Sequence, residues 1–182
     1  MNGEEQVILV DSLGQPLVKD GQIVSLPKLE VHQKGLRHLA VSVFIFDSQN
    51  RLLLQRRAQV KYHSPGKWSN TCCTHPLPGE TPIQAARRRL QEEMGLIVDI
   101  KEIFTFSYRA DVGGGLIENE FDHVFWGQSE GAPSINPDEV LEWRRISLPE
   151  LDEEMAQHQS DYTIWFLLLW SEVKKYLLSG KV

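Results

Sequence analysis

The stretch His38–Phe46 is the feature that most constrains the fold of this chain. It is a dense run of β-branched, aromatic and other apolar side chains, followed by the turn residues Asp47–Asn50 and a second predicted strand at Arg51–Arg57. Successive side chains of a strand point to opposite faces of its sheet, so a strand that is apolar on both faces needs cover on both. We therefore expect His38–Phe46 to lie at the centre of a sheet.

The other predicted elements lack the regular strand–helix–strand order of a doubly wound sheet. This favours an α+β fold in a single domain, for which 182 residues are sufficient. One helix is well marked, because Thr81 and Gln84 form a capping box and Gly95 follows its last apolar residue. The remaining predictions are strands at Glu5–Val10, Pro16–Lys19, Leu96–Ile100, Ile103–Arg109, Glu118–Trp126 and Glu142–Ile146, and helices at Pro149–His158 and Tyr162–Leu178, the last capped by Asp161.

Charge and cysteine content limit the partners of this chain. A formal net charge of −6 argues against general nucleic-acid binding, whereas the basic cluster of Arg56, Arg57, Lys61 and residues 87–89 suits a small anionic ligand. The first residues lack a signal-peptide pattern, and the longest apolar run, Ile164–Trp170, is too short to span a membrane. The two cysteines are adjacent, which argues against a stabilising disulfide. We therefore expect a cytoplasmic protein with neither a nucleic-acid nor a membrane partner.

The segment Cys73-Thr74-His75-Pro76 is the first candidate for chemistry. In an extended segment, residues two apart share a face, so Cys73 and His75 point the same way while Cys72 points the other way. Cys72 is therefore expected to be a packed core thiol and Cys73 to be the functional one. A Cys-His pair by itself is compatible with nucleophilic catalysis, with a metal site or with a thiol acting as an acid.

Three histidines and two carboxylates form the second candidate. Glu118 and Glu120 lie two apart in a predicted strand that leans toward burial, and buried carboxylates need a proton, a partner or a metal. With His32, His38 and His75 they make an N/O ligand set that suits Zn²⁺, Mn²⁺ or Fe²⁺, although spacing alone does not show that the five converge. We expect the other histidines to be structural or solvent-exposed; these are His63, His123 and His158.

The segment from Thr74 to Leu96 resembles the Nudix box, whose helix glutamates bind divalent metals that hold a diphosphate. The matching residues are Glu80, Arg88, Leu90, Glu92, Glu93, Gly95 and Leu96. Two positions depart from the box: Thr74 stands where glycine is usual, and Arg89 stands where the hydrolases have a metal-binding glutamate. A basic side chain at position 89 weakens the hydrolase interpretation and favours binding of an intact diphosphate.

Taken together, these motifs resemble the type I isopentenyl-diphosphate isomerase family over nearly the whole chain. The segments that carry the resemblance are Arg37–Ala40, Asn70–Pro76, Tyr108–Ala110 with Glu118–Glu120, and Tyr162–Trp165. The resemblance implies a Nudix-like mixed β-sheet flanked by helices, in one domain over residues 1–182 with its core at approximately 37–170. It also implies interconversion of isopentenyl and dimethylallyl diphosphate in isoprenoid biosynthesis. The partner would be a small prenyl diphosphate, and the protein would be a monomer or a weak homodimer.

The resemblance further implies a role for each site residue, position by position. Cys73 and Glu120 would handle protons, Tyr108 would hydrogen-bond to Glu120, and Trp165 would face a carbocation. One divalent metal, Mn²⁺ or Zn²⁺, would be bound by His32, His38, His75, Glu118 and Glu120. Mg²⁺ on the substrate diphosphate would be held by Glu93 and the backbone carbonyl of Cys73. The diphosphate itself would be lined by Lys28, Arg57, Lys61 and Arg89.

Two other functions stand as alternatives. A Nudix hydrolase of nucleoside or prenyl diphosphates would release phosphate, and both Arg89 and Cys73 argue against it. A metal-stabilised binding module would hold a metal tightly and turn over no diphosphate.

Overall fold

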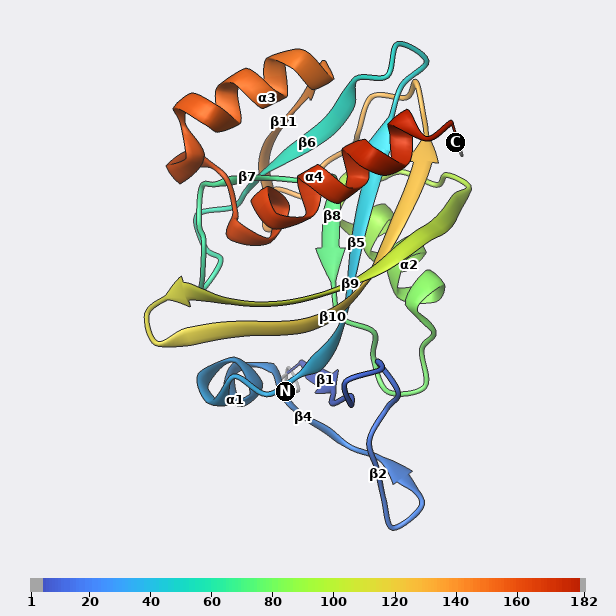
Figure 1. Ribbon diagram of the computed structural model, residues 1–182, viewed down its shortest axis with the longest axis vertical. Coiled ribbons are helices and arrows are strands. Elements are labelled where there is room, and N and C mark those ends of the chain that lie inside the picture. Colours follow the sequence, from blue (N-terminus) through green and yellow to red (C-terminus); the bar gives the residue numbers. More distant parts are fainter. Residues whose placement is uncertain (1–4, 181–182) are drawn as a thin grey trace.

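The computed structural model describes residues 5–180, which form a mixed sheet with helices on both faces (Figure 1). The main sheet has the strand order β11-β6-β5-β10-β9, with β7 beside β6 and β8 beside β5. Strands β5 and β10 run parallel to each other, and the other paired strands of this sheet are antiparallel. The elements are β1 (Gln6–Ile8), β2 (Val18–Lys19), β3 (Gln22–Ile23), β4 (Ser25–Pro27), α1 (Lys28–Lys34), β5 (His38–Phe46), β6 (Leu52–Arg57), β7 (Trp68–Ser69), β8 (Cys72–Thr74), α2 (Pro82–Met94), β9 (Ile100–Gly113), β10 (Leu116–Gln128), β11 (Val140–Ile146), α3 (Leu148–Gln157), a 3₁₀ turn (Gln159–Asp161) and α4 (Ile164–Leu178).

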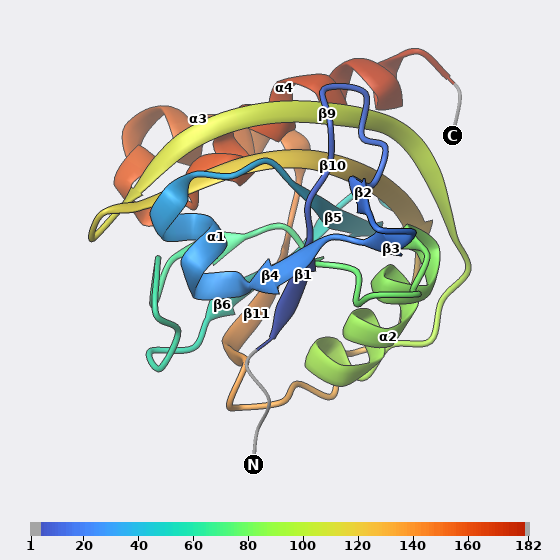
Figure 2. The same ribbon diagram turned by 90° about the horizontal axis from the view of Figure 1, so that it is seen from below.

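Strand β5 is the central strand, as its sequence predicts, and every residue of it is buried. Phe44 and Phe46 belong to a core shared with α3 and α4. Val43 and Ile45 point the other way and pack in a core shared with α2, to which Cys72 also contributes. Figure 2 shows α2 on one side of the sheet and α3 with α4 on the other. The α+β prediction and the assignment of Cys72 to the core are confirmed.

Helix α1 is the main element that the sequence pattern does not predict. It starts after Pro27 and ends at Gly35, which has the left-handed φ of 59° that glycine adopts without strain. The helix has seven residues, and of these Val31 and His32 are buried. Lys28 and His32 lie one turn apart in it, so both can face the same side of the molecule.

Several predicted boundaries are wrong; β2 covers only Val18–Lys19, and β9 continues past Arg109 to Gly113. Residues 96–99 are not a strand, and β9 runs continuously from Ile100 instead of in two pieces. Pairing starts at Ile100 because its partner strand β10 ends at Gln128, which leaves 96–99 without a neighbour. The last helix begins at Ile164 rather than at Tyr162, and Asp161 lies in the 3₁₀ turn. Tyr162 is held extended because it forms a bridge with Trp68.

Within residues 5–180, no helix has the combination of length and apolarity that crossing a membrane requires.

The turn between β5 and β6 depends on one buried carboxylate. Asp47 is fully buried, and its side chain accepts hydrogen bonds from the backbone N–H groups of Gln49 and Arg51 and from Arg51 Nε, at 2.7–3.0 Å. Burial alone would raise the pKa of Asp47, but the bonds from Arg51 and Gln49 outweigh it and lower that pKa. A lowered pKa in the folded state stabilises the protein above the ordinary value of about 3.9, and this contribution disappears as the pH falls through the folded-state pKa.

We therefore expect Asp47→Ala to lower the free energy of unfolding by about 1–3 kcal/mol at pH 7 and by clearly less near pH 3. Urea unfolding at both pH values measures the difference. Asp99→Ala is the control, because the Asp99 side chain is fully solvent-exposed. An equal loss for Asp47→Ala at both pH values would contradict the role given to the charge.

Candidate active site

A cavity of about 360 Å³ opens between α1, α2, β8, β10 and the start of α4. It brings together side chains from segments far apart in the sequence. Of the residues predicted to act, all except His32 and His38 line this cavity, and these two are completely buried beside it. The carboxylates, the thiol and the basic side chains proposed from sequence therefore converge on one place.

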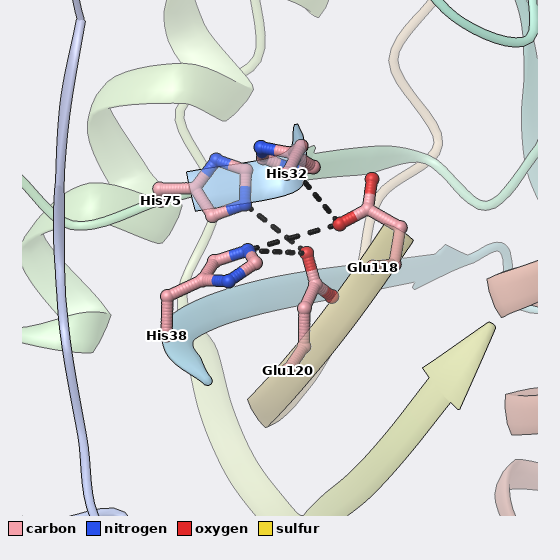
Figure 3. A group of neighbouring side chains, drawn as sticks. All are labelled: His32, His38, His75, Glu118 and Glu120. Atoms are coloured by element: carbon pink, nitrogen blue, oxygen red, sulfur yellow. Dashed lines mark hydrogen bonds and ion pairs between the residues drawn. The ribbon is translucent and has the colours of Figure 1, made fainter. Parts of the chain in front are cut away.

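The predicted metal ligands form a compact group at this cavity (Figure 3). One ligand atom from each of His32, His38, His75, Glu118 and Glu120 lies within 4.8 Å of all the others. His32 Nε2 is 2.9 Å from Glu118 Oε2, and His75 Nε2 is 3.1 Å from Glu120 Oε1. His38 Nε2 lies between the carboxylates, 3.7 Å from Glu118 and 3.5 Å from Glu120. The convergence that spacing could not show is thus present in the fold.

Two of the three histidine rings in the group, those of His32 and His38, are oriented by backbone carbonyl groups. Nδ1 of His32 is 2.6 Å from the carbonyl oxygen of Lys28, and Nδ1 of His38 is 2.9 Å from that of Leu36. A carbonyl oxygen only accepts, so each Nδ1 carries the proton and each Nε2 of the neutral ring offers its lone pair to the group. His38 Nε2 is buried and has no hydrogen-bond partner. The donor set and this unpartnered nitrogen fit a divalent cation.

The two carboxylates have opposite electrostatic environments. Burial, together with the charge of Glu120, raises the pKa of Glu118. Burial would also raise the pKa of Glu120, but the Nε2 atoms of His38 and His75, 3.5 and 3.1 Å from its Oε1, hold it well below its usual range. Burial and the charge of Lys28 lower the pKa of His75 to about 4, which favours the neutral ring that a metal requires.

His38, Glu120 and Tyr108 stand in one row across three neighbouring strands of the sheet. Glu120 on β10 is the register partner of His38 on β5 and of Tyr108 on β9. The Tyr108 hydroxyl donates to Glu120 Oε2 at 2.5 Å. Cys73 lies on β8, whose neighbour is again β5. Burial and the charge of Asp122 raise the pKa of Cys73 to about 12, so its thiol is protonated at neutral pH.

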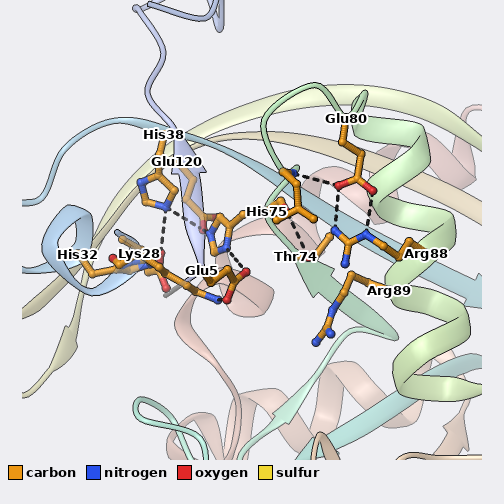
Figure 4. A network of polar contacts seen from close by, with 12 residues as sticks. Glu5, Lys28, His32, His38, Thr74, His75, Glu80, Arg88, Arg89 and Glu120 are labelled. Atoms are coloured by element: carbon orange, nitrogen blue, oxygen red, sulfur yellow. Dashed lines mark hydrogen bonds and ion pairs between the residues drawn. The ribbon is translucent and has the colours of Figure 1, made fainter. Parts of the chain in front are cut away.

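The other end of the cavity is basic. Arg89 donates to Glu93 Oε1 at 2.6 Å and lies 3.1 Å from Glu139, which also pairs with Lys61. Arg88 is already engaged, because it makes two hydrogen bonds of 2.8 Å to Glu80 at the start of the helix (Figure 4). The Glu80–Arg88 pair therefore holds the segment before α2 in place, while Arg88 and Arg89 both line the cavity.

The family of the chain follows from comparison with known proteins. Residues 36–166 match the NUDIX domain. An isopentenyl-diphosphate Delta-isomerase 2 of Aromatoleum aromaticum is 49% identical over 162 residues, 89% of this chain and 82% of that protein. An isopentenyl-diphosphate Delta-isomerase of Serratia proteamaculans is 45% identical over 170 residues, 93% and 92% of the two chains. The chain belongs to the isopentenyl-diphosphate isomerase family of Nudix proteins.

Solved structures agree on the fold. A Deinococcus radiodurans protein superposes with a TM-score of 0.67 at 19% identity, covering 85% of this chain and 90% of that one. The MutT protein of Methanosarcina mazei superposes with a TM-score of 0.63 at 17% identity, covering 80% and 96%. The Nudix-like fold expected from the sequence is confirmed.

Sequence reasoning missed several residues of this cavity, four of which have ionisable side chains. Tyr62, His63, Glu5 and Glu139 all line it. His63 is buried rather than solvent-exposed, and its Nε2 lies 3.3 Å from Glu118 Oε1. Glu5 accepts a 2.9 Å hydrogen bond from Lys28 and lies 4.0 Å from His75 (Figure 4). No motif marks these positions, although His63 follows closely on Arg57 and Lys61.

His123 pairs with Glu102, and His158 ends α3, as the structural or exposed roles predict.

Proposed function

We propose that this protein interconverts isopentenyl diphosphate and dimethylallyl diphosphate in isoprenoid biosynthesis. The observation that carries the proposal is that one cavity contains the Cys73 thiol, the Glu120 carboxylate bound to Tyr108 and the Trp165 indole. Basic side chains line the other end of the same cavity. Isomerisation needs two proton-handling groups and an anion-binding region, and this cavity has both. Membership of the isomerase family supports the same reaction.

Cys73 and Glu120 are the two proton-handling groups in this proposal. In the forward direction the terminal CH₂ carbon of the alkene gains a proton and the carbon next to the CH₂–O group loses one, so the double bond moves by one position. In the reverse direction the same two groups exchange roles. Tyr108, hydrogen-bonded to Glu120, orients that carboxylate and can pass a proton to it.

Trp165 completes the apolar end of the cavity. It is buried, its indole N–H donates to Ser69 Oγ at 3.0 Å, and the Arg57 guanidinium lies over its ring, 5.1 Å from the ring centroid. Protonation of the alkene produces a tertiary carbocation, which an aromatic face stabilises by about 2 kcal/mol or more when water is excluded. The same exclusion prevents water from trapping the cation as an alcohol.

Two divalent metals belong to this proposal. His32, His38, His75, Glu118 and Glu120 would hold Mn²⁺ or Zn²⁺, and Glu93 with the Cys73 carbonyl oxygen would hold Mg²⁺ on the substrate. When bound, these cations supply positive charge that orients Glu120 and neutralises the diphosphate. Lys28, Arg57, Lys61 and Arg89 supply the rest of that charge from the protein.

The proposed site lies within a single chain, so one copy is sufficient for activity, and we propose a monomer or weak homodimer. The unpaired thiols Cys72 and Cys73 suit the reducing cytoplasm. We also propose that residues 1–182 act as one domain with its core at approximately 37–170.

The deciding experiment incubates the purified protein with isopentenyl diphosphate, Mg²⁺ and Mn²⁺ or Zn²⁺ in D₂O. We expect dimethylallyl diphosphate carrying solvent deuterium in a methyl group, with no release of phosphate. Release of phosphate from prenyl or nucleoside diphosphates would support a hydrolase instead. A tightly bound metal with no turnover would support a binding module.

Arg89 should contribute to substrate binding more than to chemistry. We expect Arg89→Ala to raise the KM for isopentenyl diphosphate about 10- to 100-fold, the value of one or two charged hydrogen bonds, while kcat changes much less. Arg87→Ala is the matched control, because Arg87 lies on the same helix and does not line the cavity. A KM that stays at the wild-type value would exclude contact between Arg89 and the diphosphate.

A further inference from the structure

Asn70 is a fully buried side chain whose chemistry the proposed reaction does not yet use. It lies between β7 and β8, and its Nδ2 is 3.2 Å from the carbonyl oxygen of Val43 and 3.0 Å from that of Cys72. Carbonyl oxygens only accept hydrogen bonds, so the NH₂ group of the amide must face them. The orientation of the Asn70 amide is thereby determined, with Oδ1 on the opposite side.

The Asn70 Oδ1 atom contacts the proposed reacting thiol. Cys73 Sγ is 3.0 Å from it, and because Oδ1 has no hydrogen to give, the thiol is the donor. The second partner of Cys73 Sγ is Ser42 Oγ, at 3.7 Å. The direction of the Cys73 S–H bond is therefore set by Asn70, and the lone pairs of the sulfur point elsewhere.

The same oxygen is connected to the aromatic wall of the cavity. Ser69 Oγ donates to Asn70 Oδ1 at 3.0 Å and accepts from Trp165 Nε1 at 3.0 Å. Thr163 Oγ1, 3.1 Å from Ser69 Oγ, is a further neighbour of this hydroxyl. One amide oxygen thus joins Cys73 directly, and Trp165 through Ser69, while both of these side chains line the cavity.

We propose that Asn70 is a positioning residue of the isomerase, which holds the Cys73 thiol and, through Ser69, the Trp165 ring in a defined relation to each other. The role rests on the proposed function. The alkene carbon that exchanges a proton with Cys73 and the cationic carbon facing Trp165 are adjacent in the substrate, so an error in the position of either group lowers the rate. Asn70 does not line the cavity, so it acts on the substrate only through Cys73 and Ser69.

Vibrational spectra test the hydrogen bonds without turnover. The S–H stretching band of Cys73 is isolated by subtracting the infrared spectrum of Cys73→Ala. Asn70→Ala removes the acceptor, so the band should move to higher frequency. Ser69→Ala removes the competing donor, so the S–H bond to Oδ1 should strengthen and the band should move to lower frequency. In ¹H–¹⁵N spectra, the indole peak of Trp165 should move in both variants, although Asn70 does not contact the indole.

Kinetics test the consequence for the reaction. We expect Asn70→Ala to lower kcat about 100-fold, the effect of a displaced reacting group, and to leave the KM for isopentenyl diphosphate within about threefold. Ser69→Ala should lower kcat about tenfold, in line with one lost hydrogen bond. Thr71→Val is the matched control: Thr71 is equally buried, but its hydroxyl binds Leu53 and Ile45 instead of the thiol. It should keep the wild-type kcat, the S–H band and the indole peak.

The outcomes separate the two proposals. Unchanged spectra in Ser69→Ala, a variant that keeps Asn70 and its backbone bonds, would overturn the Asn70 link even if Asn70→Ala fails to fold. A folded Asn70→Ala with wild-type kcat would overturn the positioning role. A wild-type protein that does not isomerise isopentenyl diphosphate would overturn the proposed function, and the kinetic role of Asn70 with it.

Discussion

Replacing Cys73 by alanine is expected to lower kcat for isomerisation by about 10⁴-fold, the upper range for loss of a general acid or base. Cys73 is one of only two groups in the proposal that exchange protons with the substrate carbons, and no neighbouring side chain on β8 can take its place. The side chain is small and faces the cavity, so the fold should be unaffected. Formation of dimethylallyl diphosphate in D₂O measures the loss, and circular dichroism measures the fold.

Cys72→Ala is the matched control for this prediction. Cys72 is the adjacent cysteine, and it is fully buried in the core shared with α2. The substitution should lower the melting temperature because it removes a packed side chain, yet kcat per folded molecule should stay close to wild type. Full activity of Cys73→Ala, or equal losses in both variants, would contradict the role of Cys73 in proton transfer.

Removal of divalent metal is expected to abolish turnover and to destabilise the fold. Glu118 and Glu120 are buried within the same compact group, so a cation bound there would balance charge that is costly to bury. A cation at about 1,000 times its Kd stabilises the folded state by about 4 kcal/mol, which corresponds to roughly 10 °C in Tm for a chain of this length. Calorimetry after chelation, and after return of Mn²⁺ or Zn²⁺, measures both the loss and the recovery.

Glu118→Gln keeps the shape of the side chain and removes its charge, so it should reduce both the metal content and the recovery of Tm. Glu142→Gln is the control, since Glu142 is solvent-exposed on β11 and lies outside the ligand group. An unchanged Tm after chelation, with no metal in the purified protein, would exclude a metal at these five residues.

Local patterns predicted much of this fold. The apolar run at β5 indicated the central strand, the Thr81 capping box and Gly95 marked α2, and strand alternation separated Cys72 from Cys73. Each of these signals lies within a few neighbouring residues. Helix α1 was missed because it is short and buries few side chains, so its hydrophobic period is weak.

The assembly of the site could not be read from sequence spacing. His32 meets Glu118 only because α1 packs beside β10, and His38 meets Glu120 only because β5 and β10 pair in parallel at that register. These contacts join segments separated by about 80 residues, and no local signal encodes them. The family resemblance supplied the ligand set, and the contacts explain why those residues belong together. His63 and Glu139 were missed for the same reason.

The row His38–Glu120–Tyr108 links the site to the backbone pairing of three adjacent strands. An insertion or deletion of a single residue within β10 would turn Glu118 and Glu120 to the opposite face at once, so activity would be lost even where the core could adapt. The tip of the β9–β10 hairpin is different: Gly113, Gly114 and Gly115 there have open space around them. Insertions and deletions should therefore be tolerated at this tip and should abolish activity within the strands. Activity measured across a library of insertions in β9 and β10 would show where tolerance ends.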